Sequence, residues 1–170
     1  MKKTGVVYDG YPSKEELEQS PGFPNTCSLS KGTKAVIECV QNIPCNPCEA
    51  ACPYGAITIG DNITNLPILD VEKCIGCGNC VAPCPGLAIF TVNMNYSDTE
   101  AAIEFPFEYF PLPNKGDIVD AVNRAGEIMC KGTIIGIRSA KVFANTNVIK
   151  IAVPKEFADI VRSIKRLPRK

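Results

Sequence analysis

Eight of the ten cysteines in this 170-residue chain fall into two short runs with nearly the same spacing. The first run reads Cys39-VQNIP-Cys45-NP-Cys48-EAA-Cys52-Pro53, and the second reads Cys74-IG-Cys77-GN-Cys80-VAP-Cys84-Pro85. The last three cysteines of the first run recur in the second at one constant shift of 32 positions. Two copies of one ligand loop restrict the fold more than any other feature of the sequence does.

The second run is a complete C-x2-C-x2-C-x3-C-P, which is the ligand pattern of bacterial iron–sulfur ferredoxins. In two-cluster proteins the fourth cysteine of such a run binds the other cluster. We therefore predict two groups of thiols, each of which holds one [4Fe–4S] cluster. The first thiol group includes Cys45, Cys48 and Cys84. The second thiol group is Cys52, Cys74, Cys77 and Cys80. The pattern makes electron transfer the first hypothesis for function.

The fourth ligand of the first thiol group is the one position where the two runs differ. Asn42 stands where the 32-residue shift from Cys74 predicts a cysteine, and Cys39 lies three residues earlier. We favour Cys39, brought to the same iron by a longer loop that Pro44 keeps extended. Two alternatives stay open, namely a three-iron cluster with an open corner and ligation by Cys27.

Zinc and disulfide readings of these cysteines are weaker. Zinc sites use separated cysteine pairs, often together with histidine, and the chain has no histidine. The first residues, MKKTGVVYDGYPSKEE, lack the apolar core of a signal peptide, so we expect a reducing, cytoplasmic location. Cys27 and Cys130 stand apart from both runs, and we expect each to be an idle or buried thiol.

Composition excludes several classes of function. Lys plus Arg and Asp plus Glu both total 18, which gives no general signature of nucleic-acid binding. The charge is split, because residues 1–100 carry 6 basic and 11 acidic side chains, whereas residues 101–170 carry 12 and 7. No apolar run reaches the roughly 20 residues that a membrane span needs. Glycine-rich nucleotide motifs are absent, so we predict no flavin or nicotinamide site and no catalytic residue in this chain.

Hydrophobic periodicity and turn residues divide the chain into four parts. We predict an irregular extension over 1–34, with a capping box of Ser13 and Glu16, and a cluster domain over 35–93. Residues 94–113 read as an aromatic and proline connector, not as a central strand, that lies either in an interface or against its own chain. Residues 114–170 predict a small barrel of short strands and then an amphipathic helix from Pro154.

The cluster domain resembles the bacterial-type two-[4Fe–4S] ferredoxin family. The resemblance rests on both cysteine runs and on the approach DVEKCIGC, which spans Asp70 to Cys77. It implies an α+β fold with a pseudo-twofold axis, in which strand, loop, helix and strand occur twice and each half closes on the other. The fold class that we expect for the whole chain is this α+β domain, then the small β-barrel-like module and the C-terminal amphipathic helix.

The complete chain resembles the small iron–sulfur subunits of flavin-dependent amino-acid dehydrogenases of the proline and hydroxyproline type. The resemblance rests on the opening IPCNPCEAACP and on the β-rich module that follows the clusters. It implies a hetero-oligomer with flavoprotein subunits, in which this chain relays single electrons from one flavin to a second flavin or another acceptor. The alternatives are a free soluble shuttle ferredoxin and a binding module with structural clusters.

Overall fold

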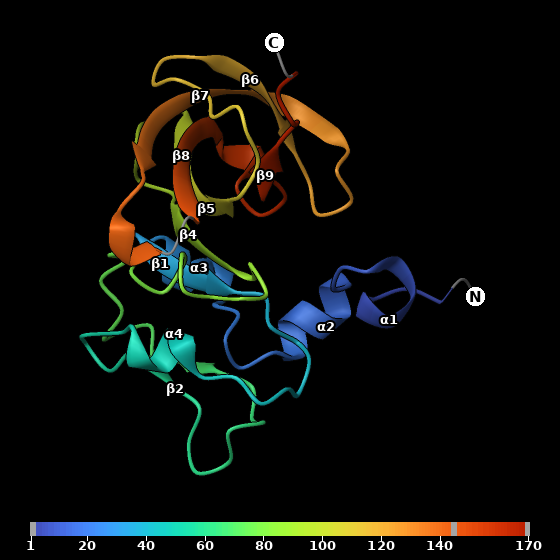
Figure 1. The fold of residues 1–170 in the computed structure, drawn as a ribbon, viewed down its shortest axis with the longest axis vertical. Coiled ribbons are helices and arrows are strands. Elements are labelled where there is room, and N and C mark those ends of the chain that lie inside the picture. The colour runs from blue at the N-terminus through green and yellow to red at the C-terminus, as the bar shows by residue number, and fades with distance from the viewer. Residues whose placement is uncertain (1–2, 144–145, 169–170) are drawn as a thin grey trace.

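A computed structural model describes residues 3–143 and 146–168 of the chain. Seven strands form one antiparallel sheet in the order β1-β4-β5-β8-β7-β6-β9. The strands are β1 (Lys34–Ile37), β4 (Ile89–Asn93), β5 (Glu100–Phe107), β6 (Ile118–Val122), β7 (Ile128–Arg138), β8 (Asn147–Pro154) and β9 (Ser163–Ile164). The cysteine segment, from Cys39 to Cys84, lies on one side of this sheet, below it in Figure 1.

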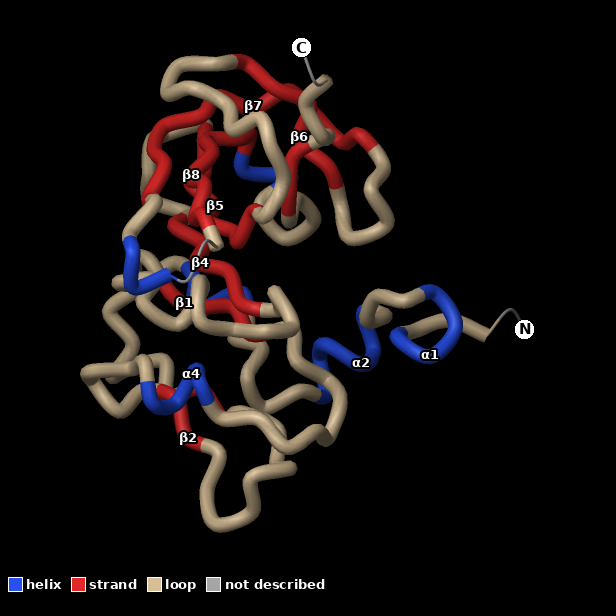
Figure 2. The backbone as a smooth tube through the Cα atoms, in the orientation of Figure 1, coloured by secondary structure: helices blue, strands red, loops and turns tan. Residues whose placement is uncertain are grey.

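The cysteine segment is mostly loop, whereas the strands are concentrated in the sheet (Figure 2). It contains the short helix α4 (Pro47–Ala50) and a two-stranded sheet of β2 (Ile57–Thr58) and β3 (Ile68–Leu69). The second cysteine run has turns where the first has α4, so a helix forms in only one of the two described halves. Within the described residues, no helix is long and apolar enough to cross a bilayer.

The predicted pseudo-twofold arrangement is present in the strand pairing. Ile37 of β1 pairs with Ile89 of β4, and Leu69 of β3 pairs with Ile57 of β2. A shift of 32 positions converts Ile37 to Leu69 and Ile57 to Ile89, so the two pairs are equivalent. Each half of the segment therefore pairs the strand that enters its own cysteine run with the strand that leaves the other run.

The N-terminal extension crosses this pseudo-twofold axis. It contains α1 (Val6–Asp9), α2 (Lys14–Gln19) and α3 (Thr26–Leu29), and the predicted capping box of Ser13 and Glu16 begins α2. After α2, the carbonyl of Gly22 accepts from the Ile37 N–H at 3.2 Å, and the carbonyl of Pro21 accepts from the Leu69 N–H at 3.2 Å. Two equivalent strands are thus held by two consecutive residues of the extension.

The prediction that the proline-rich stretch cannot be a central strand is wrong. Residues 100–107 form β5, which lies between β4 and β8. Pairing with β4 ends at Glu104, whereas pairing with β8 continues through Pro106 and Phe107. Proline lacks the N–H that a ladder uses, and it is tolerated here because β5 has only one paired neighbour at that point. Phe105 and Phe107 are buried, which favours packing within the chain over an interface for these two rings.

The predicted C-terminal amphipathic helix is also wrong. A single 3-10 turn, Lys155–Phe157, follows β8, and the chain then continues into β9 at the edge of the sheet. The N–H groups of Arg162 and Lys165 donate to the carbonyls of Val122 and Asp120 in β6, at 3.0 and 2.8 Å. The apolar residues Ala158, Val161 and Ile164 pack into the sheet core. One i to i−4 bond forms, from the Val161 N–H to the Phe157 carbonyl at 2.9 Å, and bonding to β6 then takes the place of the longer helix that the spacing suggested.

The predicted small barrel is not closed in the part of the chain that the structure describes. The strands β6 to β8 of this module are curved, as Figure 1 shows, but the sheet ends at β9 on one side. On the other side β5 pairs with β4, and β4 pairs with β1. The sheet therefore continues from the C-terminal module into β4 and β1, the two strands that flank the cysteine segment, and it stays open.

Candidate iron–sulfur site

The eight cysteines of the two runs gather into two groups of four. In the second thiol group, burial, together with the charges of Cys74, Cys77 and Cys52, raises the pKa of Cys80 to about 12. In the first thiol group, burial, together with the charges of Cys84 and Cys45, raises the pKa of Cys48 to about 11. Each group thus contains one cysteine from the opposite run. These are the predicted ligand sets, although ligation itself stays a prediction.

Cys39 belongs to the first thiol group. Burial raises the pKa of its thiol, and the charges of Cys84 and Cys45 act in the same direction. Asn42 does not take its place, because the Asn42 amide donates to the Thr64 carbonyl at 3.1 Å. Cys27 is exposed on α3, and its charge acts on the neighbouring Lys31. The placement favours Cys39 over Cys27 as the fourth thiol of the group.

The second thiol group surrounds a small cavity. Cys52, Cys74, Cys77 and Cys80 all line it, together with Ala35, Tyr54, Ala56, Ile57, Ile75, Gly76, Gly78 and Asn79. The wall is mostly apolar, and small residues let the backbone come close to the space. Four thiols around an apolar cavity match the donors and the dry surroundings that a [4Fe–4S] cluster takes.

Backbone amides point at the sulfur atoms in a symmetric way. The Ala56 N–H donates to Cys52 Sγ at 3.3 Å, and the Ala88 N–H donates to Cys84 Sγ at 3.5 Å. These two bonds are related by the same shift of 32 positions. A third bond runs from the Ala35 N–H to Cys74 Sγ at 3.4 Å. Such bonds favour the thiolate and help to set the reduction potential of a cluster.

The spacing of the thiols suits a cluster better than a single ion. Among the described residues, no three His, Cys, Asp or Glu side chains converge tightly enough to hold one metal ion. A cubane cluster places its four thiolates at separate corners and so needs a wider arrangement than a mononuclear shell. The residues therefore fit [4Fe–4S] clusters, which supply one-electron redox chemistry when bound.

Two cations beside the second cysteine run were not predicted from the sequence. Lys34 is buried and donates to the carbonyls of Val71 and Cys74 at 2.8 and 2.7 Å. Arg138, at the end of β7, donates to the carbonyls of Cys77 and Gly78 at 3.3 and 3.2 Å. Neither contact has a signal in the sequence, because each joins positions that are 37 to 61 residues apart.

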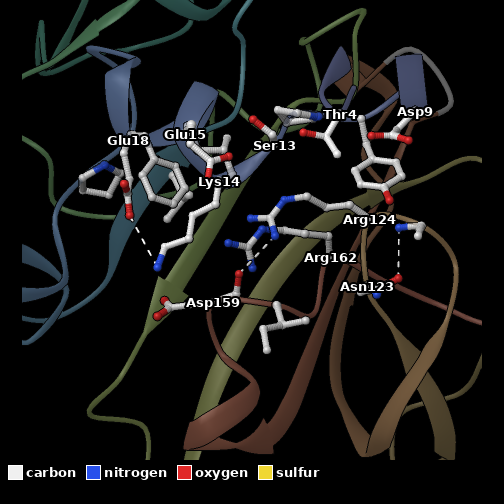
Figure 3. Close-up of a pocket in the computed structure, with 18 of the residues that line it drawn as sticks. Thr4, Asp9, Ser13, Lys14, Glu15, Glu18, Asn123, Arg124, Asp159 and Arg162 are labelled. Atoms are coloured by element: carbon white, nitrogen blue, oxygen red, sulfur yellow. Dashed lines mark hydrogen bonds and ion pairs between the residues drawn. The ribbon is translucent and has the colours of Figure 1, made fainter. Parts of the chain in front are cut away.

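A groove of about 800 Å³ lies between the N-terminal extension and the sheet (Figure 3). Ten of its lining residues are labelled there: Thr4, Asp9, Ser13, Lys14, Glu15, Glu18, Asn123, Arg124, Asp159 and Arg162. Both acidic and basic side chains line it, so its charges do not select an ion of one sign. Arg124 and Arg162 bind the buried carboxylate of Glu38, the residue before Cys39.

Comparison with known proteins agrees with the geometry. Residues 38–88 match the family described as the 4Fe-4S dicluster domain. The chain is 32% identical over 88 residues to the polyferredoxin-like subunit of an aliphatic sulfonate oxidoreductase from Pyrococcus furiosus, covering 51% of this chain and 43% of that protein. It is 36% identical over 95 residues to a subunit of the F(420)H(2) dehydrogenase from Methanosarcina mazei, covering 49% of this chain and 54% of that protein.

A further relative is a subunit of an ion-translocating oxidoreductase complex from Methanosarcina acetivorans, 48% identical over 59 residues, or 35% of this chain and 21% of that protein. The three matches thus span between 21% and 54% of the length of these relatives. No solved structure matches the chain. The family match and the two groups of thiols lead to one conclusion. Residues 38–88 are a two-[4Fe–4S] ferredoxin segment.

Proposed function

We propose that this chain is the electron-transfer iron–sulfur subunit of a multisubunit oxidoreductase. Cys39, Cys45, Cys48 and Cys84 hold the first cluster, and Cys52, Cys74, Cys77 and Cys80 hold the second. The single observation that supports this most is the crossed arrangement, in which each group takes one thiol from the other run. Crossed ligation places the two clusters close together within one fold, which suits electron transfer between them.

The surface near the cysteines supports a protein partner. Five large apolar side chains of the cysteine segment are between 45% and 55% exposed: Ile43, Tyr54, Ile63, Ile68 and Ile75. Apolar groups that remain exposed around a redox site are typical of surfaces that a partner covers. The named relatives are subunits of oxidoreductases, which supports the same role.

The electron donor in this proposal is a flavoprotein subunit. The chain relays single electrons from this flavin to a second flavin or another acceptor, and the partner supplies the bond-breaking chemistry. The substrate of the complex in this proposal is an amino acid of the proline or hydroxyproline type, as the resemblance noted for the complete chain implies. The role of this chain's own residues is to bind the clusters, exclude water and set their potentials.

An anaerobic purification through a tag on this chain tests the proposal. We expect flavoprotein subunits to co-purify in fixed stoichiometry. Replacing Cys77 with Ser should then stop reduction of the acceptor, while substrate still reduces the flavin of the complex. The matched control is Cys27→Ser, because Cys27 is exposed and lies outside both thiol groups. A monomer without partners, or acceptor turnover that survives Cys77→Ser, would contradict the proposal.

A further inference from the structure

The cysteine loop of the second cluster contacts β7 through the side chain of Arg138. Arg138 ends β7 and donates from Nη1 to the carbonyl of Cys77 and from Nη2 to the carbonyl of Gly78, at 3.3 and 3.2 Å. The two acceptors are consecutive, so the planar guanidinium binds the loop with two of its nitrogen atoms. The sheet thereby fixes the position of one predicted cluster ligand, Cys77, and of the amide beside it.

Arg138 is itself fixed by its neighbours. Its Nη2 lies 3.0 Å from Oε2 of Glu104 on β5, and Lys150 of β8 lies 3.3 Å from Oε1 of the same carboxylate. The guanidinium carbon also lies 5.6 Å from the centre of the Phe143 ring. Arg138 and Lys150 share the carboxylate of Glu104, so these three side chains together keep a net positive charge next to the loop.

The approach of Arg138 to the loop depends on a glycine. Gly78 has φ +73°, which side chains rarely adopt, and a Cβ built there would lie 2.5 Å from Arg138 Nη2 and 2.6 Å from Glu104 Oε2. Real Cβ atoms do not come so close to other heavy atoms. The absence of a side chain at position 78 therefore lets the cation reach the backbone of the cluster loop.

The first cluster has no equivalent cation contact among the described residues. The 32-residue shift relates Cys77 and Gly78 to Cys45 and Asn46. The Asn46 carbonyl accepts instead from the N–H groups of Glu49 and Ala50 in α4, at 3.1 and 3.3 Å. Lys34, which binds the second loop, corresponds to Leu66, whose side chain carries no donor. The two halves share their fold but differ in the charge that contacts the ligand loop.

We propose that Arg138 is a positioning residue that raises the reduction potential of the second cluster selectively. A nearby cation stabilises the reduced, more negative form of a cluster, and a partly buried cation is screened less than an exposed one. With both clusters bound, a single electron would then be held preferentially at the site of Cys52, Cys74, Cys77 and Cys80. This inference rests on the proposed ligand sets and goes beyond them, because the residue lies outside the ferredoxin segment.

A reductive titration of Arg138→Gln, followed by electron paramagnetic resonance, tests the inference. Gln keeps a donor but removes the charge. We expect the ratio of reduced to oxidised second cluster to fall about tenfold at a fixed potential. This corresponds to a reduction potential that is lower by about 59 mV for one electron. The first cluster should not shift. Arg138→Lys should restore most of the difference, and Lys131→Gln, an exposed cation of β7 paired with Asp120, should shift neither cluster.

A second variant should shift the reduction potential of the second cluster in the opposite direction. It also serves as the test if Arg138→Gln does not assemble its clusters. Glu104→Gln removes the shared negative charge, so the potential of the second cluster should rise. The signals are assigned with Cys77→Ser and Cys45→Ser, each of which should alter the spectrum of one cluster. Equal shifts of both clusters, or none in either variant, would overturn the role of Arg138. Cysteine variants that alter neither spectrum would instead overturn the ligand sets.

Discussion

Arg162 Nε lies 2.5 Å from Glu38 Oε1, although the two residues are 124 positions apart in the chain. Both side chains are only 4% exposed. Arg124 binds the same carboxylate from the β6–β7 turn, and Arg162 also donates to the carbonyls of Ala158 and Val161. Burial lowers the pKa of Arg162, and the charge of Glu38 opposes that effect. The ion cluster thus joins the residue before Cys39 to the C-terminal module.

Replacing Glu38 with Gln should destabilise the protein strongly. The amide keeps the volume but leaves two arginines without a counter-ion, and breaking a buried pair in this way costs about 3–5 kcal/mol. The measurement is the midpoint of denaturation under anaerobic conditions. Glu72→Gln is the matched control, because Glu72 pairs with Lys31 at 2.9 Å on the exposed surface. Similar midpoints for the two variants would show that the buried cluster does not hold the two parts together.

Gly22→Ala should also destabilise the fold. A Cβ at this position would lie 2.8 Å from the Pro67 carbonyl oxygen and 2.9 Å from the Ile37 Cβ. Backbone movement there disturbs the contacts of the extension with both equivalent strands, and overpacking of this kind costs about 1–3 kcal/mol. Gly136→Ala is the control, because its nearest neighbour, the Lys150 Cβ, is at an ordinary 3.6 Å. Equal denaturation midpoints for wild type and Gly22→Ala would refute a tight crossing.

Cluster assembly should release protons and accelerate as the pH rises. Burial raises the pKa of Cys80 to about 12 and that of Cys48 to about 11, so both thiols are protonated at neutral pH before iron binds. Metal ligation requires thiolates, which become more abundant as the pH increases towards these values. The measurement is the rate of reconstitution of iron-free protein between about pH 7 and pH 9. A rate that falls over this range would contradict the protonated starting state.

Cys39→Ser should convert the first cluster into a weakened or three-iron form and leave the second unchanged. The reason is that the Cys39 thiol lies with Cys45 and Cys84, whereas Cys27 lies apart. Iron content and the resonance spectrum of the oxidised protein measure the outcome. Cys27→Ser provides the comparison, and we expect it to match the wild type. Loss of the cluster in Cys27→Ser, with Cys39→Ser unaffected, would reverse the assignment.

The cysteine segment could be predicted from the sequence because its constraints are local. Ligand spacing and the repeated shift of 32 positions identify the two loops, and β1, β2, β3 and β4 form where alternating apolar residues flank them. The strands β6, β7 and β8 were likewise anticipated from turns and alternation. Within each loop and each strand, the decisive residues lie within about a dozen positions of one another.

The remaining features depend on contacts between distant residues. The spacing of Phe157, Ile160, Val161 and Ile164 fits a helix, but pairing with β6 and the ion pair of Arg162 with Glu38 decide the actual structure. Pro106 suits β5 only because the pairing of β5 with β4 stops at Glu104. The contact of Arg138 with Cys77 follows from how the sheet packs on the loop, which no local pattern reveals.

The most direct test of the account is spin quantitation of the fully reduced, anaerobically purified chain by electron paramagnetic resonance. Two [4Fe–4S] clusters in crossed loops predict about two spins per chain, with the line broadening of two centres that interact magnetically. A single isolated spin per chain, or a spectrum of a three-iron centre in fresh protein, would contradict the two complete sites on which the electron relay depends.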